Sequence, residues 1–235
     1  MRPALLSIIA AAVGISAAPL ESRAVINSDA VVGFPQTVPS NVYGDNYLRF
    51  KPWLKVVNGC VPFPAVDAAG NTGGGLKPTG ASNGGCSKST GQVYARGGAY
   101  NGRYAIMYSW YMPKDSPSSG LGHRHDWECA IVWLDDGAKA DPTIVALSAS
   151  GHGKFDTITG GFELDGTRPK IRYFSDWPLD HRLGFTSTQG GEQPLIAWES
   201  MTDAARTALT NTDFGAANVP FKDPNFMDNL AKASP

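Results

Sequence analysis

Segments rich in β-branched and aromatic residues recur along this chain without long helices between them, and this pattern constrains its fold most. We predict strands at residues 92–96, 103–112, 127–134, 143–150, 170–174 and 194–198. Helices are predicted at 46–54, at 200–209 and at the C-terminus, where Asp223 would cap a helix that begins at Pro224. Several strands, few helices and no βαβ alternation predict a mainly β fold, a single-domain β-sandwich with peripheral short helices.

The first residues resemble a secretory signal peptide, with Arg2, an apolar run over 4–13 and small residues ending at Ala17 and Ala18. We predict a signal peptide at 1–17, one domain at 18–235 and an extracellular location. A membrane anchor is the weaker alternative, because the apolar run is shorter than the roughly 20 residues that a spanning helix needs. Loss of Arg2 changes the formal charge from −1 to −2. The mature protein then has no basic stripe for nucleic acid, and nothing in it implies a stable protein partner.

The chain has three cysteines, which in a secreted protein predict one disulfide and one free thiol. Cys60 and Cys86 bracket a stretch rich in Gly and Pro that can hardly order itself by burying apolar surface. A bridge that closes this loop would stabilise the fold by roughly 3 to 4 kcal/mol. Cys129 begins an apolar run, and we predict that it is a buried, inert thiol.

Residues 122–128 read Gly-His-Arg-His-Asp-Trp-Glu, two imidazoles, one guanidinium and two carboxylates within seven residues of a chain that is 17% charged. Polar side chains this dense rarely serve packing alone. Three carboxylates and one imidazole of this region can converge on one spot: Asp115, His123, Asp126 and Glu128. Such an oxygen-dominated set suits magnesium or calcium, whereas zinc usually prefers more nitrogen or sulfur.

The expected strand ends explain how these residues would meet. Pro113 cannot donate to a ladder, so we expect the strand to end before it and to leave Asp115 in a loop. If the next strand begins near His125, Asp126 and Glu128 share one of its faces. The glycines of the segment would allow a turn that swings the first imidazole to the same side.

A plainer interpretation is that the two carboxylates of the heptapeptide only form surface ion pairs. Asp126 and Glu128 would then pair with Arg124 and Lys114 on a solvated rim, where such pairs are common and weak. In the metal hypothesis, Arg124 and His125 lie at the rim or behind the ligands, and His125 packs beneath the loop.

Residues 105–115, Ala-Ile-Met-Tyr-Ser-Trp-Tyr-Met-Pro-Lys-Asp, together with Gly120-Leu121 and the heptapeptide, resemble the signature of the necrosis- and ethylene-inducing peptide-like proteins. These are secreted cytolysins of plant-associated microbes, and the resemblance covers about residues 30–229. It implies an actinoporin-like β-sandwich, a Cys60–Cys86 disulfide and a divalent cation on the same four predicted ligands. Met112 departs from the family, in which an aromatic residue, usually Phe, is expected at this position.

The resemblance also implies roles for His152, Trp177 and His181. Matching positions lie in loops that meet the bilayer and the sugar head group of a plant sphingolipid, a glycosylated inositol phosphorylceramide. An exposed Trp suits a membrane interface or a sugar ring. The alternatives are a Trp177 folded back on the core and histidines with purely structural roles. A plant immune receptor that recognises the 105–128 region is a further implied partner.

Different classes of function remain open on these residues. One is a cytolysin and virulence effector of the host apoplast that docks through its cation on a sphingolipid head group and disrupts the membrane. Another is a secreted metal-assisted hydrolase with Glu128 or His125 as base. No Ser-His-Asp or Cys-His signature offers a competing chemistry, so we expect a toxin and not an enzyme. A non-lytic member that is only sensed as an immune pattern is the remaining alternative.

Overall fold

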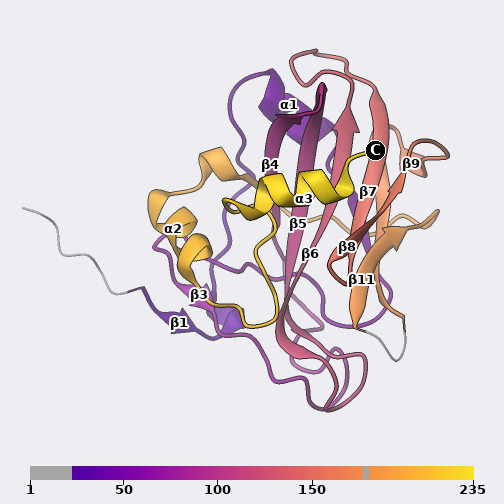
Figure 1. Cartoon of the computed structure of the whole chain (residues 1–235). Coiled ribbons are helices and arrows are strands. Elements are labelled where there is room, and N and C mark those ends of the chain that lie inside the picture. The colour runs from indigo at the N-terminus through magenta and orange to yellow at the C-terminus, as the bar shows by residue number, and fades with distance from the viewer. Residues whose placement is uncertain (1–22, 177–179) are drawn as a thin grey trace, which may run out of the picture.

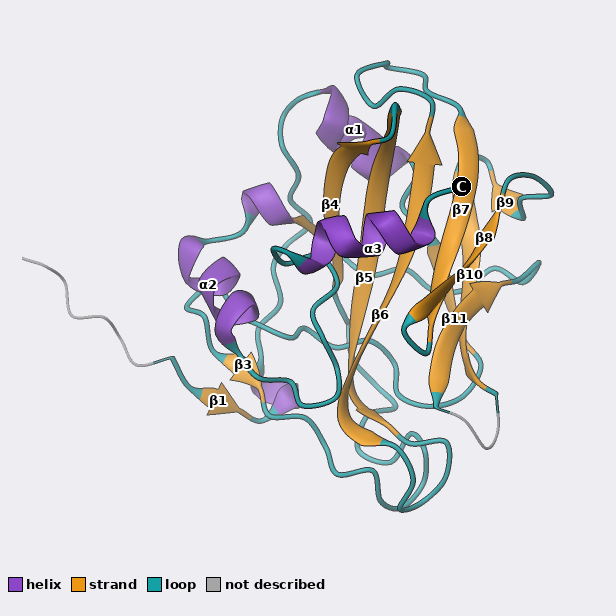
Figure 2. Ribbon diagram, in the orientation of Figure 1, coloured by secondary structure: helices purple, strands orange, loops and turns teal. Residues whose placement is uncertain are grey.

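The computed structural model describes residues 23–176 and 180–235, so the predicted signal peptide and Trp177 lie outside the described residues. The main element is a six-stranded sheet in the order β12-β4-β5-β6-β7-β8 (Figures 1 and 2). Its strands are β4 (Val93–Tyr100), β5 (Arg103–Asp115), β6 (His123–Leu134), β7 (Ile144–Gly151), β8 (Lys154–Ile158) and β12 (Leu195–Ala197). Neighbouring strands are antiparallel, except that β12 runs parallel to β4.

A second, smaller sheet packs against the first. Its strands are β2 (Trp53–Val56), β9 (Leu164–Asp165), β10 (Arg168–Ser175) and β11 (His181–Phe185). β10 pairs antiparallel with β11 and parallel with β2, and β11 contacts β7 and β6 of the large sheet. A short parallel pair, β1 (Val25–Ile26) and β3 (Thr72–Gly73), lies apart from both. This arrangement confirms the predicted β-sandwich.

Short helices surround the sandwich: α1 (Val42–Arg49), α2 (Asp203–Asn211), α3 (Asn225–Ala233) and the 3-10 turns η1 (Ser28–Ala30) and η2 (Trp198–Ser200). The side chains of Asn41 and Thr202 cap α1 and α2 by accepting backbone N–H groups. α3 crosses the outer face of the large sheet (Figure 1). Phe226 of α3 covers the Arg96 guanidinium of β4 at 4.6 Å, and Ser148 of β7 donates to the carbonyl of Ala233 at 3.0 Å.

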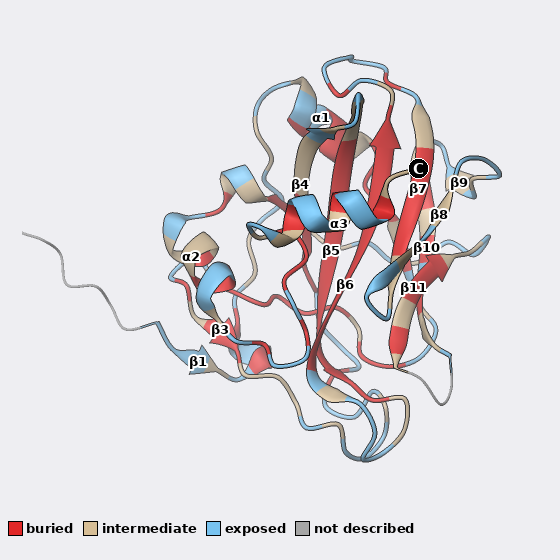
Figure 3. Cartoon of the chain, viewed as in Figure 1, coloured by how far each residue is buried: buried red, intermediate tan, exposed pale blue. Residues whose placement is uncertain are grey.

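The central strands are therefore covered on both faces, by the small sheet on one side and by α3 with its preceding loop on the other. Residues 105–115 of β5 and 125–134 of β6 are all buried (Figure 3). The described part of the chain contains no helix with the length and apolar character needed to cross a bilayer.

Several predicted boundaries were wrong. β5 continues through Pro113 to Asp115, because the register shifts there and the proline sits at a bulge, where a missing N–H costs no ladder bond. The helix predicted at 46–54 ends at Arg49 and the chain enters β2 at Trp53, since Pro52 disfavours helical backbone at the residue before it.

The C-terminal helix begins later than predicted, and Asp223 does not cap it. α3 starts at Asn225 with Pro224 in the capping position and no side-chain cap. The Asp223 carboxylate instead pairs with Arg96 at 2.8 Å.

The disulfide prediction is confirmed. Cys60 and Cys86 are bridged and Cys129 is a buried free thiol, whose pKa burial raises. The loop within the bridge is tied to the β5–β6 hairpin: Leu76 N–H donates to the Pro113 carbonyl, and Gly120 N–H donates to the Pro78 carbonyl, both at 2.7 Å.

Candidate functional site

Two backbone bulges shape the end of the β5–β6 hairpin. Lys114 lies opposite both Arg124 and His125, and Asp115 pairs with His123. His125 has a φ of 62°, the left-handed conformation that accommodates the extra residue. The extra residue inverts the alternation of side chains, so that His123 and Asp126 face the same side although they are three apart in sequence. The bulge at His125, and not only the preceding glycines, brings the imidazole of His123 to the carboxylates.

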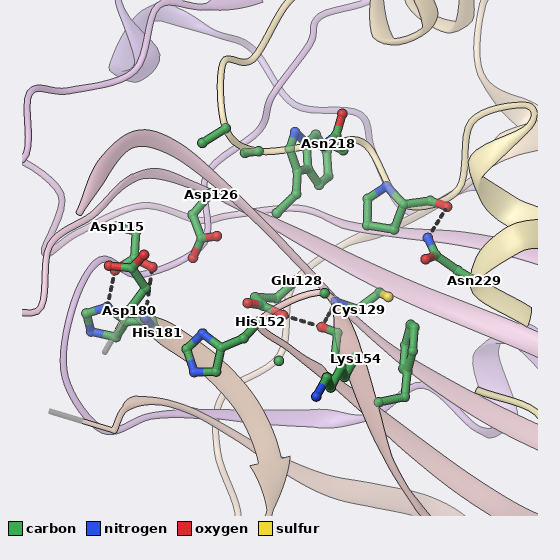
Figure 4. A pocket seen from close by; sticks show the side chains of 18 of the residues that line it. Asp115, Asp126, Glu128, Cys129, His152, Lys154, Asp180, His181, Asn218 and Asn229 are labelled. Atoms are coloured by element: carbon green, nitrogen blue, oxygen red, sulfur yellow. Dashed lines mark hydrogen bonds and ion pairs between the residues drawn. The ribbon is translucent and has the colours of Figure 1, made fainter. Parts of the chain in front are cut away.

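The structure brings three of the four predicted ligands together. One ligand atom each of Asp115, His123 and Asp126 lies within 4.8 Å of the others. Glu128 lines the same pocket but is outside this group, and one of its oxygens accepts the Ser150 hydroxyl (Figure 4). The carboxylates of Asp115 and Asp126 are buried, at 1% and 5% exposure, and do not lie on an exposed loop rim.

Each carboxylate has its own hydrogen-bond donor from another element. His181 of β11 donates its backbone N–H to Asp115 at 2.8 Å, and its Nδ1 lies 2.6 Å from the other Asp115 oxygen. Tyr173 of β10 donates its hydroxyl to Asp126 at 2.6 Å. The rings of Tyr173 and His181 stack with centroids 4.7 Å apart at 14°. Together with the Ser150 hydroxyl, which donates to Glu128, these donors fix the orientation of the three carboxylates.

His181 was proposed from the resemblance as a head-group residue, and the structure shows its contacts. Its side chain is 1% exposed, and its Nε2 has no hydrogen-bond partner among the described residues. Gly59 (φ 82°) packs against the ring so closely that a Cβ there would lie 2.5 Å from Nε2. His181 therefore contacts Asp115 from within the fold, although it lines the pocket.

Burial and mutual repulsion disfavour the charged forms of Asp126 and Glu128. Burial raises the pKa of Asp126, and the neighbouring Asp115 raises it further; burial and then Asp126 do the same for Glu128. Within 23–176 and 180–235, neither Asp126 nor Glu128 forms an ion pair with a Lys or Arg. Such a set of carboxylates fits a hard divalent cation, which takes oxygen ligands and neutralises them.

The alternative of ion pairs on a solvated rim is wrong. Lys114 is buried and its Nζ donates to the carbonyls of Thr79 and Ala81, at 3.1 and 2.9 Å. Arg124 is exposed and donates to the carbonyls of residues 74 and 75, at 2.7 and 2.9 Å. The Lys114 and Arg124 side chains therefore hold the loop between Cys60 and Cys86 against the hairpin. Within the described ranges, neither side chain forms an ion pair with Asp126 or Glu128.

His125 packs beneath the hairpin as expected. Its Nδ1 lies 2.7 Å from the Tyr111 hydroxyl, and its ring meets Phe214 edge to face with centroids 5.2 Å apart. Burial, followed by the charge of Arg124, lowers the pKa of His125 to about 4. The ring is thus neutral at physiological pH and is held away from the acid cluster, which we define as Asp115, Asp126 and Glu128.

The site lies in a pocket of about 370 Å³, within the range of pockets that bind small molecules. His152 is exposed on the β7–β8 turn, with a φ of 52°, and lines this pocket. Asp180 also lines it, 3.7 Å from the His123 imidazole. Asp180, Tyr173 and Ser150 were not predicted as site residues from the sequence. Its position next to His181 is the only feature of the sequence that could have indicated Asp180. No feature of the sequence indicated Tyr173 or Ser150.

The model of the family described as "Necrosis inducing protein (NPP1)" matches residues 44–233. The chain belongs to this necrosis-inducing protein family. It is 54% identical to NLP effector protein 10 of Phytophthora capsici over 215 residues, covering 89% of this chain and 92% of that protein.

Among solved structures, NLPPya in complex with mannosamine or glucosamine is 59% identical, with TM-scores of 0.85 and 0.84 over 89% of this chain and 99% of that chain. The non-toxic HaNLP3 protein is 42% identical, with a TM-score of 0.85 over 88% of this chain and 98% of that chain. The actinoporin-like fold that the resemblance implies is thereby confirmed, and the relative from Phytophthora capsici is an effector protein.

Proposed function

We propose that this family member is a secreted cytolysin that uses a divalent cation, magnesium or calcium, to bind a plant membrane sphingolipid. The observation that carries the proposal is the convergence of Asp115, His123 and Asp126 within 4.8 Å. Among the described residues, no Lys or Arg forms an ion pair with Asp115 or Asp126. Glu128 is the fourth proposed ligand, reached by a side-chain rotation or through water. When bound, the cation would neutralise these carboxylates and coordinate hydroxyl oxygens of a sugar.

The target is the head group of a glycosylated inositol phosphorylceramide in the host plasma membrane. Support comes from NLPPya, which has been solved with two amino sugars. His152 is placed on the pocket rim, where it can meet such a sugar. His181 would act through Asp115, whose carboxylate it orients. Trp177 remains a proposal from sequence alone, as the aromatic that contacts the bilayer interface.

We further propose the predicted processing and localisation. Residues 1–17 would be the signal peptide and 18–235 the mature protein, released into the host apoplast. An immune receptor that recognises the 105–128 region would need a cleaved or unfolded chain, because residues 105–115 are buried in β5. Support comes from the similarity to Phytophthora effector proteins.

The alternative of a metal-assisted hydrolase has less support. A base must reach a water held by the cation. His125 is turned toward Tyr111 and Phe214, and one oxygen of Glu128 is engaged by Ser150. The non-toxic HaNLP3 shares the fold, so lysis by this chain must be tested directly.

Dye release from vesicles that contain plant glycosylated inositol phosphorylceramide tests the proposal. Wild-type protein should release dye with Ca²⁺ or Mg²⁺ and lose this activity in excess chelator. Asp126→Asn keeps the shape of the buried side chain but removes its charge, and it should abolish cation binding and leakage. Asp141→Asn is the matched control, since Asp141 is an exposed acid paired with Arg49. Leakage that persists in chelator and in Asp126→Asn would refute the proposed mechanism.

A further inference from the structure

One segment of the loop between Cys60 and Cys86 binds both strands of the β5–β6 hairpin at the bulge. We call this segment, residues 74–81, the clamp loop. Lys114 of β5 and Arg124 of β6 are paired with each other at the bulge. Each side chain donates to two backbone carbonyls of the clamp loop, which are those of Thr79 and Ala81 for Lys114 and those of Gly74 and Gly75 for Arg124.

Backbone hydrogen bonds extend this contact to both sides of Asp115. Before Asp115 in the sequence, the Pro113 carbonyl accepts the N–H of Leu76 at 2.7 Å. After it, the N–H of Gly120 donates to the Pro78 carbonyl, also at 2.7 Å. The clamp loop therefore connects the end of β5 with the turn that leads into β6.

The clamp loop also packs closely against the bulge itself. Gly75 has a φ of 63°, and a Cβ there would lie 2.7 Å from the His125 ring and 2.8 Å from Cγ of Arg124. His125 is the residue whose left-handed backbone forms the bulge. The clamp loop thus contacts the residue on which the direction of the His123 side chain depends.

The bulge needs such support because it interrupts the ladder between the strands. A shift of the pairing by one residue would turn the side chains beyond it to the opposite face. Asp115 pairs with His123 beyond the bulge, so their convergence requires that this register is held. Lys114 holds it firmly, since its ammonium group is buried and a buried charge without hydrogen bonds is costly.

We propose that Lys114 and Arg124 are positioning residues of the cation site, which fasten the clamp loop across the bulge and keep Asp115 and His123 directed at the cation. This inference rests on the proposed function. The effect passes through the backbone, since both groups donate to carbonyls and form no ion pair in the part of the chain that the structure describes. Ligands that are already ordered bind more tightly, because less conformational entropy is lost on binding.

Terbium luminescence tests the role of the two side chains. Tb³⁺ is a hard cation with oxygen ligands; its titration gives an affinity, competition gives that of Ca²⁺, and lifetimes in H₂O and D₂O give the number of coordinated waters. Arg124→Gln, at an exposed position, should weaken both cations by about threefold to tenfold, and Lys114→Met by about tenfold to a hundredfold. The bound Tb³⁺ should gain about one water, because water replaces a ligand that no longer reaches the cation.

Matched controls separate positioning from a general loss of stability. Arg206→Gln removes a guanidinium that also donates to two backbone carbonyls and does not line the pocket. Lys51→Met removes a buried ammonium group that donates to an amide oxygen and a backbone carbonyl. Both controls should lower the melting temperature and leave the cation affinity and the number of waters as in the wild type. Arg124→Lys, which keeps a donor within reach of the carbonyls, should recover most of the affinity.

The outcomes separate this inference from the proposed function. An unchanged affinity and water number in Arg124→Gln overturn the inference whether or not Lys114→Met folds, and so do equal losses of affinity in the controls. Wild-type protein that binds neither Tb³⁺ nor Ca²⁺ would instead contradict the proposed function. Hydrogen exchange then decides the clamp alone: the amides of Leu76 and Gly120 should exchange faster in Arg124→Gln than in Arg206→Gln, and equal rates overturn it.

Discussion

Replacing Tyr173 by Phe isolates one support of the proposed cation site. The Tyr173 hydroxyl donates to the Asp126 carboxylate at 2.6 Å, and both residues are buried. The ring stacks on His181, which in turn binds Asp115. Tyr173→Phe removes one oxygen and keeps the ring, so the stack and the packing should survive while Asp126 loses its donor.

The size of the effect follows from the charge of the acceptor. A hydrogen bond to a charged group contributes about 1.5 to 3 kcal/mol. Because burial and Asp115 raise the pKa of Asp126, the protein without cation favours the neutral acid. Cation binding requires the carboxylate, which the Tyr173 hydroxyl stabilises. Tyr173→Phe should therefore weaken cation affinity by about tenfold to a hundredfold, as outer partners of metal ligands commonly do.

Calcium titration by calorimetry, with melting temperatures measured with and without calcium, checks this expectation. Tyr108→Phe is the matched control, because the buried Tyr108 hydroxyl donates to the carbonyl of Tyr47 at 2.8 Å. The control should cost about 1 kcal/mol of stability, as for a lost neutral hydrogen bond, and leave calcium affinity unchanged. Unchanged calcium affinity in Tyr173→Phe, or an equal loss in Tyr108→Phe, would refute the reasoning.

Three further predictions concern strain, the cysteines and pH. Gly59→Ala should displace the His181 ring, since the new Cβ would lie 2.5 Å from Nε2 at a φ of 82°. The melting temperature should fall by the equivalent of about 1 to 3 kcal/mol of stability. An unchanged melting temperature would show that the close approach to His181 does not constrain residue 59. Cys60→Ser should lower the free energy of unfolding, measured with denaturant, by roughly 3 to 4 kcal/mol. Cys129→Ser should cost only what a small buried side chain costs. A larger loss for Cys129→Ser than for Cys60→Ser would count against the assignment of the disulfide. The raised pKa of Asp126 means that, in chelator, its contribution to stability is present below the ordinary carboxyl pKa and is lost as pH rises through the raised value. Calcium should suppress this loss of stability at higher pH. Melting temperatures that vary with pH identically with and without calcium would contradict this prediction.

The sequence by itself determined the features that depend on neighbouring residues. Alternating β-branched and aromatic residues placed the main strands, because side chains alternate between the faces of a strand. The heptapeptide and Asp115 identified the four predicted ligands, since three of them, His123, Asp126 and Glu128, lie within six residues of one another. The Gly-rich segment between Cys60 and Cys86 indicated the disulfide, because such a loop has little apolar surface to order it.

Only the tertiary structure decided how these acids are held. His181 binds Asp115 across 66 residues, and Tyr173 binds Asp126 across 47, contacts that exist because the small sheet packs on the large one. The bulge that turns His123 into the site depends on the pairing of two whole strands, which no local pattern shows. The alternative of surface ion pairs placed Lys114 beside the acids, but its ammonium group is bound to loop carbonyls. A charged side chain takes whichever partners the packed backbone places within reach, and that choice is made by contacts remote in sequence.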